Sequence, residues 1–206
     1  MDHLGLQRAV VGGISMGAGV ALNLASRYPQ RVAGLVLSRP AWLDSPRPEN
    51  LEAYPVIARL LREHGAERGR ELFDGTEEYA ELERAAPGAG RSLASSQFGR
   101  PRAREFAVVL QSLAGDAPSA NRAQWREVRV PALVLASWQD PTHPHSYAEI
   151  LARELPSARL AELTPKAKDE GRHAADARAA IAGFLGRVFP SAAAQEEATR
   201  KEAAGR

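Results

Sequence analysis

Short apolar runs alternate with helical patterns towards both ends of the chain. Runs rich in valine, leucine, isoleucine and alanine, typical of buried parallel strands, occupy residues 8–14, 31–38, 128–137 and 158–163. Apolar residues recur with helical period over residues 16–27, 145–155 and 174–189. Because parallel strands are joined by right-handed crossovers, this order predicts an α/β fold with a mostly parallel sheet.

The middle of the chain has a different pattern, in which charged segments of helical period are separated by proline and glycine. Helices are expected there at residues 49–63, 67–73, 76–85, 91–98 and 102–113. We therefore divide the chain into a sheet-forming segment at 1–42, a helical insertion at 43–126, a second sheet-forming segment at 127–190 and a tail at 191–206. The tail has no large apolar residue, so we expect it to be frayed or disordered.

Composition narrows the class of protein. The 206 residues carry 27 Lys and Arg against 25 Asp and Glu, and this near balance argues against a nucleic-acid partner. No run approaches the roughly 18 apolar residues that a membrane span needs, and the N-terminus lacks a secretory pattern. We therefore expect a cytoplasmic protein with no membrane partner. The absence of cysteine excludes a disulfide framework and a thiol nucleophile.

Residues 13–17 read GISMG and match the G-x-S-x-G pattern between the first expected strand and the helix that follows it. A serine at such a sharp turn adopts a strained backbone conformation that lifts its hydroxyl off the sheet, and side chains at Gly13 and Gly17 would collide. The N-terminus of the helix directs free N–H groups, including that of Met16, at a developing oxyanion. Ser15 is therefore a candidate nucleophile. The alternative is a glycine-rich helix start packed closely on a sheet.

A serine hydroxyl needs a general base and a group that orients this base. Of the five histidines, His173 falls in the expected loop after the last strand, at the same sheet edge as Ser15, because both follow the carboxyl ends of parallel strands. Asp140 directly follows the third strand, so the three residues have the order nucleophile, acid, base. Asp44 is the second candidate for the acid, and a solvated residue capping the final helix is the alternative for His173.

Two further histidines, His143 and His145, follow Asp140 closely and raise the question of a metal site. Histidines at this spacing share a face only on a strand, whereas Pro141 and Pro144 favour a loop. We expect these histidines at the rim of a pocket and predict neither a metal nor a cofactor.

Three segments, taken in order, resemble the α/β-hydrolase family. GGISMGAGVALNLASRYPQRVAGLVLS resembles its nucleophile elbow, following helix and next strand. VRVPALVLASWQDPTHP resembles its acid-bearing strand and loop, and GRHAADARAAIAGFL its histidine loop and last helix. The resemblance covers about residues 4–188 apart from the insertion. It implies a triad of Ser15, His173 and Asp140, and a helical cap formed by the insertion over the pocket.

The activity that this resemblance implies is that of a serine hydrolase acting by acyl transfer on a small ester, thioester or lactone. Peptidase and cofactor-free peroxidase chemistry use the same triad and stay open. A non-catalytic remnant or interaction protein is the alternative from another class. The aromatic residues Trp42, Phe98 and Trp125 favour an apolar or aromatic acyl group, because some of them are expected to line the pocket.

The sequence departs from the family before the elbow. Four strands, and a His-Gly type segment that donates the second N–H of the oxyanion hole, have no counterpart before the opening MDHLGLQ. We therefore expect the chain to be the C-terminal part of a longer hydrolase, with the coding frame continuing upstream. The first strand is expected to form an open sheet edge that favours self-association, and activity is expected to be weak.

Overall fold

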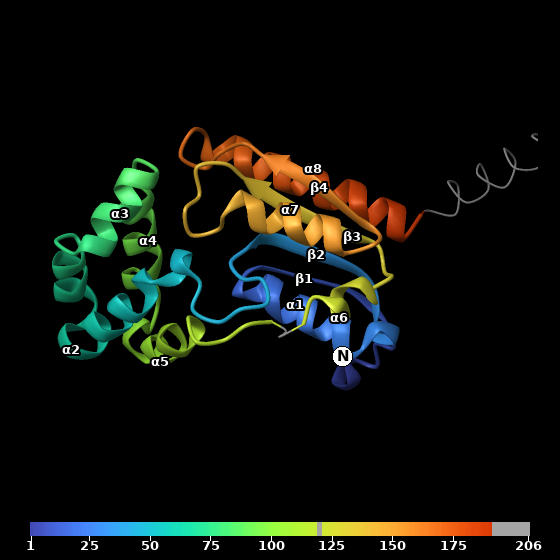
Figure 1. The fold of residues 1–206 in the computed structure, drawn as a ribbon, viewed down its shortest axis with the longest axis horizontal. Coiled ribbons are helices and arrows are strands. Elements are labelled where there is room, and N and C mark those ends of the chain that lie inside the picture. The colour runs from blue at the N-terminus through green and yellow to red at the C-terminus, as the bar shows by residue number, and fades with distance from the viewer. Residues whose placement is uncertain (119–120, 191–206) are drawn as a thin grey trace, which may run out of the picture.

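The computed structural model describes residues 1–118 and 121–190, and the tail predicted at 191–206 lies outside these ranges. Four parallel strands form one sheet in the order β1-β2-β3-β4 (Figure 1). Their bounds are Ala9–Ser15 for β1, Val32–Pro40 for β2, Ala132–Ser137 for β3 and Ala158–Leu163 for β4. The parallel α/β sheet predicted from the sequence is confirmed.

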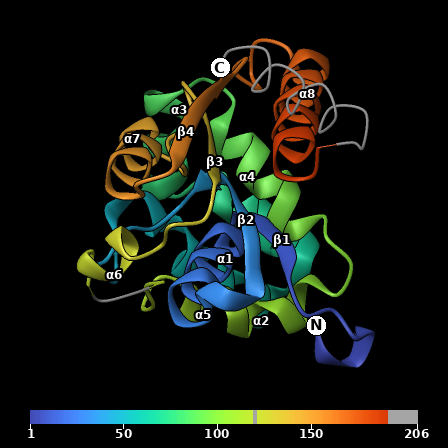
Figure 2. The same ribbon diagram turned by 90° about the vertical axis from the view of Figure 1, so that its right-hand side faces the viewer.

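Helices cover both faces of the sheet. They are α1 (Met16–Arg27), α7 (His145–Glu154) and α8 (Glu170–Val188). Helices α1 and α7 lie on one face and α8 lies on the other (Figure 2). In β2, Leu35 and Leu37 pack in the layer of α1 and α7, whereas Val36 packs with Phe184 of α8. Burial on both faces explains why β2 reads as a continuous apolar run.

Strand β3 begins four residues later than the run at 128–137 predicted. Pro131 has no N–H to donate to a strand ladder, and its carbonyl oxygen accepts a hydrogen bond of 2.9 Å from the backbone N–H of Leu35. Val128 and Val130 pack in the same hydrophobic cluster as Trp125 of the short helix α6 (Ala123–Arg126). Val128 and Val130 are therefore buried although they precede the strand.

Four helices form a separate group, which we call the helical cluster. They are α2 (Ala53–Phe73), α3 (Glu77–Ala85), α4 (Ala89–Phe98) and α5 (Ala103–Leu113). The cluster lies beyond one end of the sheet (Figure 1) and has its own core, in which the ring of Phe73 contacts Tyr79 and Phe98 at centroid distances of 5.7 and 5.9 Å. Gly65, with a φ of 74°, breaks α2 between the two helices predicted at 49–63 and 67–73. In the described ranges, no helix has the length and apolar character to cross a bilayer.

Strand β1 is an edge of this sheet, because β2 is its only neighbour in the described ranges. Its apolar residue Ile14 is 60% exposed, and Val20 on the adjacent helix α1 is 63% exposed. No charged residue or proline interrupts residues 9–14. An exposed strand without such protection is a template for pairing with another strand.

We expect the described edge to drive self-association between copies of this chain, and we expect Ile14→Lys to weaken it by at least about tenfold, since a charge would be desolvated at the contact. Sedimentation velocity over a concentration series measures this change. Val108→Lys is the matched control, because Val108 lies on α5, away from β1, and is 68% exposed. A wild-type protein that stays monomeric at every concentration would contradict the expectation.

Candidate active site

The turn between β1 and α1 places Ser15 in a conformation that few side chains adopt. Its φ and ψ are 56° and −116°, and it is the residue immediately before the first turn of α1, which begins at Met16. Helix α1 crosses so close to the strand that a Cβ built on Gly13 would lie 2.2 Å from the carbonyl carbon of Gly17. The sequence prediction for Gly13 is therefore confirmed. The prediction for Gly17 is wrong, because a Cβ there has nothing within 4 Å.

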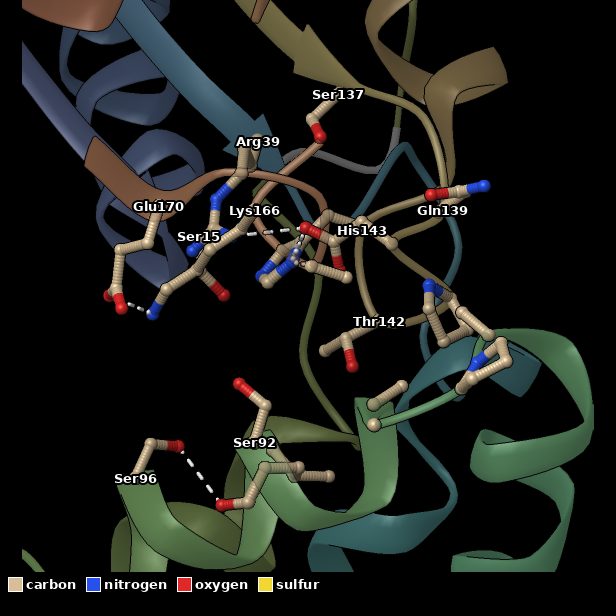
Figure 3. Close-up of a pocket in the computed structure, with 18 of the residues that line it drawn as sticks. Ser15, Arg39, Ser92, Ser96, Ser137, Gln139, Thr142, His143, Lys166 and Glu170 are labelled. Atoms are coloured by element: carbon tan, nitrogen blue, oxygen red, sulfur yellow. Dashed lines mark hydrogen bonds and ion pairs between the residues drawn. The ribbon is translucent and has the colours of Figure 1, made fainter. Parts of the chain in front are cut away.

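A cavity of about 500 Å³ opens where the four strands end. Ser15 lies at the end of β1, Arg39 near the end of β2, Asp140 after β3 and Lys166 after β4, and all four line the cavity. Helix α4 supplies the opposite wall, from which Ser92 and Ser96 face the strand ends (Figure 3). A volume of this size is in the range of small-molecule pockets.

Backbone strain gathers at the same strand ends. Ser15, Arg39 and Gln139 have φ values of 56°, 45° and 59°, and they are three of the five non-glycine residues with positive φ in the described ranges. All three line the cavity. Such conformations cost free energy and are concentrated at functional sites.

Asp140 is held by two partners. Nδ1 of His143 lies 2.9 Å from Oδ1 and 3.0 Å from Oδ2 of Asp140, and Nη1 of Arg39 donates to Oδ2 at 3.1 Å. The backbone N–H of His143 also donates to the carbonyl oxygen of Asp140 at 3.1 Å, closing a tight turn over Asp140, Pro141, Thr142 and His143. The His143 side chain is thereby folded back onto the carboxylate three residues before it.

The charge state of Asp140 follows from these contacts. Burial raises the pKa of this carboxyl, but the hydrogen bond and the charge of His143, followed by the positive charge of Arg39, outweigh burial, so the pKa lies below its ordinary value. Burial, assisted by the charge of Asp140, raises the pKa of the neighbouring Tyr54 hydroxyl to about 12. At neutral pH the cavity therefore contains an ionised carboxylate and a neutral phenol.

His173 lies elsewhere in the structure. The sequence predicted a loop at this position, but the structure has the first turn of α8, which begins at Glu170. The side chain of Asp169 caps this helix, because its Oδ1 accepts a hydrogen bond of 2.8 Å from the backbone N–H of Arg172. Nδ1 of His173 lies 2.8 Å from the carbonyl oxygen of Thr164. His173 is not among the residues that line the cavity, and in the described ranges it has no hydrogen bond to Asp140. The structure thus brings Ser15 and Asp140 to one cavity and leaves His173 outside it.

Other candidates from the sequence have structural roles. Asp44, the second candidate for the acid, accepts a 2.8 Å hydrogen bond from Nε of Arg122 and does not line the cavity. The expectation that some of Trp42, Phe98 and Trp125 line this cavity is wrong, since all three are buried in hydrophobic clusters. Trp42 instead lines a second cavity of about 280 Å³, together with Met16.

His143 lines the cavity, in agreement with its expected place at the rim of a pocket, whereas His145 does not line it. The contacts of His143 and Arg39 with Asp140 were not predicted from the sequence. For His143 a signal existed, because Asp-Pro-x-His places proline at the second position of a turn and brings the first and fourth residues together. Arg39 carried no comparable signal. The ring of His145 stacks on Trp138 at 3.8 Å between centroids, and the described ranges contain no group of three side chains able to hold a metal ion.

Alanine should have opposite effects on stability at the two glycines of the turn around Ser15. Gly13→Ala should destabilise the protein by about 3 kcal/mol or more, since a methyl group would overlap the backbone of α1 and force the strand and helix apart. Gly17→Ala should be neutral or stabilising by up to about 1 kcal/mol, because alanine is the better helix former and the space is open. Urea unfolding of both variants measures the difference, and equal stabilities would refute the close approach.

The contribution of Asp140 to the free energy of unfolding should depend on pH. Asp140→Asn should lower the free energy of unfolding at neutral pH by about 1–3 kcal/mol, because charge-assisted hydrogen bonds from His143 and Arg39 are weakened. A carboxyl with a depressed folded-state pKa stabilises the fold above its unfolded-state pKa, and this contribution disappears as the pH falls through the folded-state pKa. The gap between wild type and variant should therefore close below about pH 4 in a series of unfolding curves. A gap independent of pH would contradict this assignment.

Comparison with known proteins places the chain in a family. The model of the alpha/beta hydrolase fold matches residues 1–171. The chain is 31% identical over 164 residues to a pimeloyl-[acyl-carrier protein] methyl ester esterase of Aromatoleum aromaticum, a match that covers 75% of this chain and 64% of the esterase. It is 35% identical over 75 residues to a 2-hydroxy-6-oxo-6-phenylhexa-2,4-dienoate hydrolase of Comamonas testosteroni, over 35% of this chain and 26% of that protein. The matches therefore span less than two thirds of either relative.

Solved structures agree with the family model. A thermophilic esterase from Thermogutta terrifontis has a TM-score of 0.64 at 25% identity, covering 91% of this chain and 68% of the esterase. The enol-lactonase from Burkholderia xenovorans has a TM-score of 0.61 at 24% identity, with coverage of 90% and 68%, and supports the fold alone. With the strained Ser15 turn, the parallel sheet and the family model in agreement, the chain belongs to the alpha/beta hydrolase fold family.

Proposed function

We propose that this protein is a serine hydrolase that acts by acyl transfer, with Ser15 as its nucleophile. The observation that carries the proposal is the conformation of Ser15, which sits at a strained strand-to-helix turn and opens into a cavity lined by groups from all four strand ends. Strain of this kind is retained where it presents a reactive group. The relatives named as an esterase and a hydrolase support the same class of reaction.

In the proposed reaction, Oγ of Ser15 attacks the carbonyl carbon of the substrate and its proton passes to a general base. The backbone N–H of Met16, in the first turn of α1, stabilises the oxyanion together with the helix dipole. Collapse of the tetrahedral intermediate releases the leaving group with a proton from the base. Water then attacks the acyl-enzyme and gives a proton to the base. The second tetrahedral intermediate collapses, the bond to Oγ of Ser15 breaks, and the base returns the proton to Oγ as the acid leaves.

The substrate we propose is a small ester, thioester or lactone. The cavity of about 500 Å³ has both polar and apolar walls, with Ser92 and Gln97 among the polar groups and Leu93 and Ala89 among the apolar ones. We further propose that the helical cluster acts as a cap, because its helix α4 faces the strand ends across the cavity. Among the described residues, Tyr54 of α2 is the one Phe, Tyr or Trp side chain that lines this cavity, so the proposed substrate does not require an aromatic acyl group.

A non-catalytic protein is the second candidate, and one observation favours it. The carboxylate of Asp140 is engaged by Arg39 and His143, while His173 lies outside the cavity, so the triad that the resemblance implies is not assembled. A folded protein with no turnover of esters across a range of acyl lengths would support this candidate.

The nucleophile is tested by covalent labelling with a fluorophosphonate probe. We expect the wild-type protein to be labelled and Ser15→Ala to lose both the label and ester turnover, the latter by at least about 1,000-fold, since the attacking oxygen is gone. Ser92→Ala is the matched control, because this serine lines the same cavity from a regular helix and should keep the label. Labelling that survives Ser15→Ala, or a folded wild type that is never labelled, would refute Ser15 as nucleophile.

A further inference from the structure

The imidazole of His143 is buried in an arrangement that leaves one of its nitrogens unused. Its side chain is 9% exposed, and its Nδ1 lies within 3.0 Å of both carboxylate oxygens of Asp140. Its other nitrogen, Nε2, is buried and has no hydrogen-bond partner. In the described ranges, His143 lines the same cavity as Ser15 (Figure 3).

The hydrogen bond to Asp140 decides what Nε2 can do. An ionised carboxylate only accepts hydrogen bonds, so Nδ1 carries the proton and donates it. In the neutral ring Nε2 is then an acceptor with a free lone pair. Leaving such a buried nitrogen without a partner is unfavourable, and a buried group of this kind calls for a functional explanation.

Each group around the ring favours a base at this position. Asp140 fixes the tautomer and stabilises the imidazolium that forms when Nε2 takes a proton. Arg39 donates to Oδ2 of the same carboxylate and holds it in place. The turn through Pro141 places the backbone of His143 beside Asp140, so that its ring reaches the carboxylate three residues before it.

His173 lacks these features. Its Nδ1 contacts the backbone carbonyl of Thr164, which carries no full charge, and the cavity is lined by Lys166, Ala167 and Glu170 from this part of the chain. Its carboxylate neighbour Asp176, three residues further along α8, accepts hydrogen bonds from Thr164 and Arg172.

We propose that His143 is the general base for Ser15 and that Asp140 and His143, from one loop, form the acid–base pair of the site. This inference rests on the proposed serine hydrolase function. As Oγ of Ser15 bonds to the carbonyl carbon, the hydroxyl proton moves to Nε2 of His143 and the carbonyl π pair moves to the oxygen. When the bond to the leaving group breaks, that group takes the proton from Nε2, and Asp140 stays ionised throughout. Arg39 is a positioning residue that acts through Asp140.

The test compares three histidine variants by rate of fluorophosphonate labelling and by ester turnover. His143→Ala should lower both rates by about 100- to 10,000-fold, the usual contribution of a general base. Added imidazole should restore part of the rate in His143→Ala, because the deletion leaves a space for it beside Asp140. His173→Ala and the control His64→Ala, on the helical cluster, should stay within about threefold of wild type. Thermal melts of each variant confirm that it is folded.

A second measurement does not depend on the folding of His143→Ala. The decline of turnover at acid pH, which reports protonation of the base, should persist in His173→Ala, where His143 is intact. Loss of this decline in His173→Ala, or a folded His143→Ala that is labelled at the wild-type rate, would overturn the inference and leave Ser15 as nucleophile. A folded wild type that is never labelled would overturn the proposed function and this inference together.

Discussion

The packing of α1 against the end of β1 is the constraint on which the rest of the site depends. With no side chain at Gly13, the helix backbone comes close enough that even a methyl group would overlap it. This approach forces the sharp turn at Ser15 and directs the first N–H groups of α1 towards the cavity. The stability of the sheet and the position of the candidate nucleophile are therefore set by the same contact.

The parallel sheet extends this constraint to the other strands. Because all four strands run in one direction, the loops that follow them meet at a single edge, and each contributes a polar side chain to one cavity. The helical cluster closes the cavity from the other side with a core of its own. A separate core allows the wall opposite Ser15 to vary in sequence without disturbing the sheet, which explains how a shared fold accepts different substrates.

The loop after β3 concentrates the charge of the site. Arg39 and His143 approach Asp140 from β2 and from the same loop, and their contacts keep a largely buried carboxyl ionised. An ion pair buried in this way adds little to stability overall, because desolvation offsets attraction. Its value lies in fixing the direction of the carboxylate and of the imidazole that it holds.

The fold and the candidate nucleophile can be predicted from the sequence, because both depend on local patterns. The strand runs, the GISMG turn and the glycine break in α2 are all short-range signals, and each strand and break lies within a few residues of its predicted place. The position of Ser15 follows from a strand ending where a helix begins.

The partners of Asp140 depend on packing between distant segments and on turn geometry, so the sequence does not predict them. His173 was expected in a loop, but α8 begins at Glu170, after the cap Asp169, and therefore includes His173. Its Nδ1 contacts the carbonyl oxygen of Thr164. His143 is a near neighbour in sequence whose role depends on how a turn folds, and Arg39 is separated from Asp140 by the whole helical cluster. The order of elements along the chain predicts that the strand ends meet at one edge of the sheet. It does not predict which side chains are in contact there, because those contacts depend on turn geometry and on packing between segments that are distant in sequence.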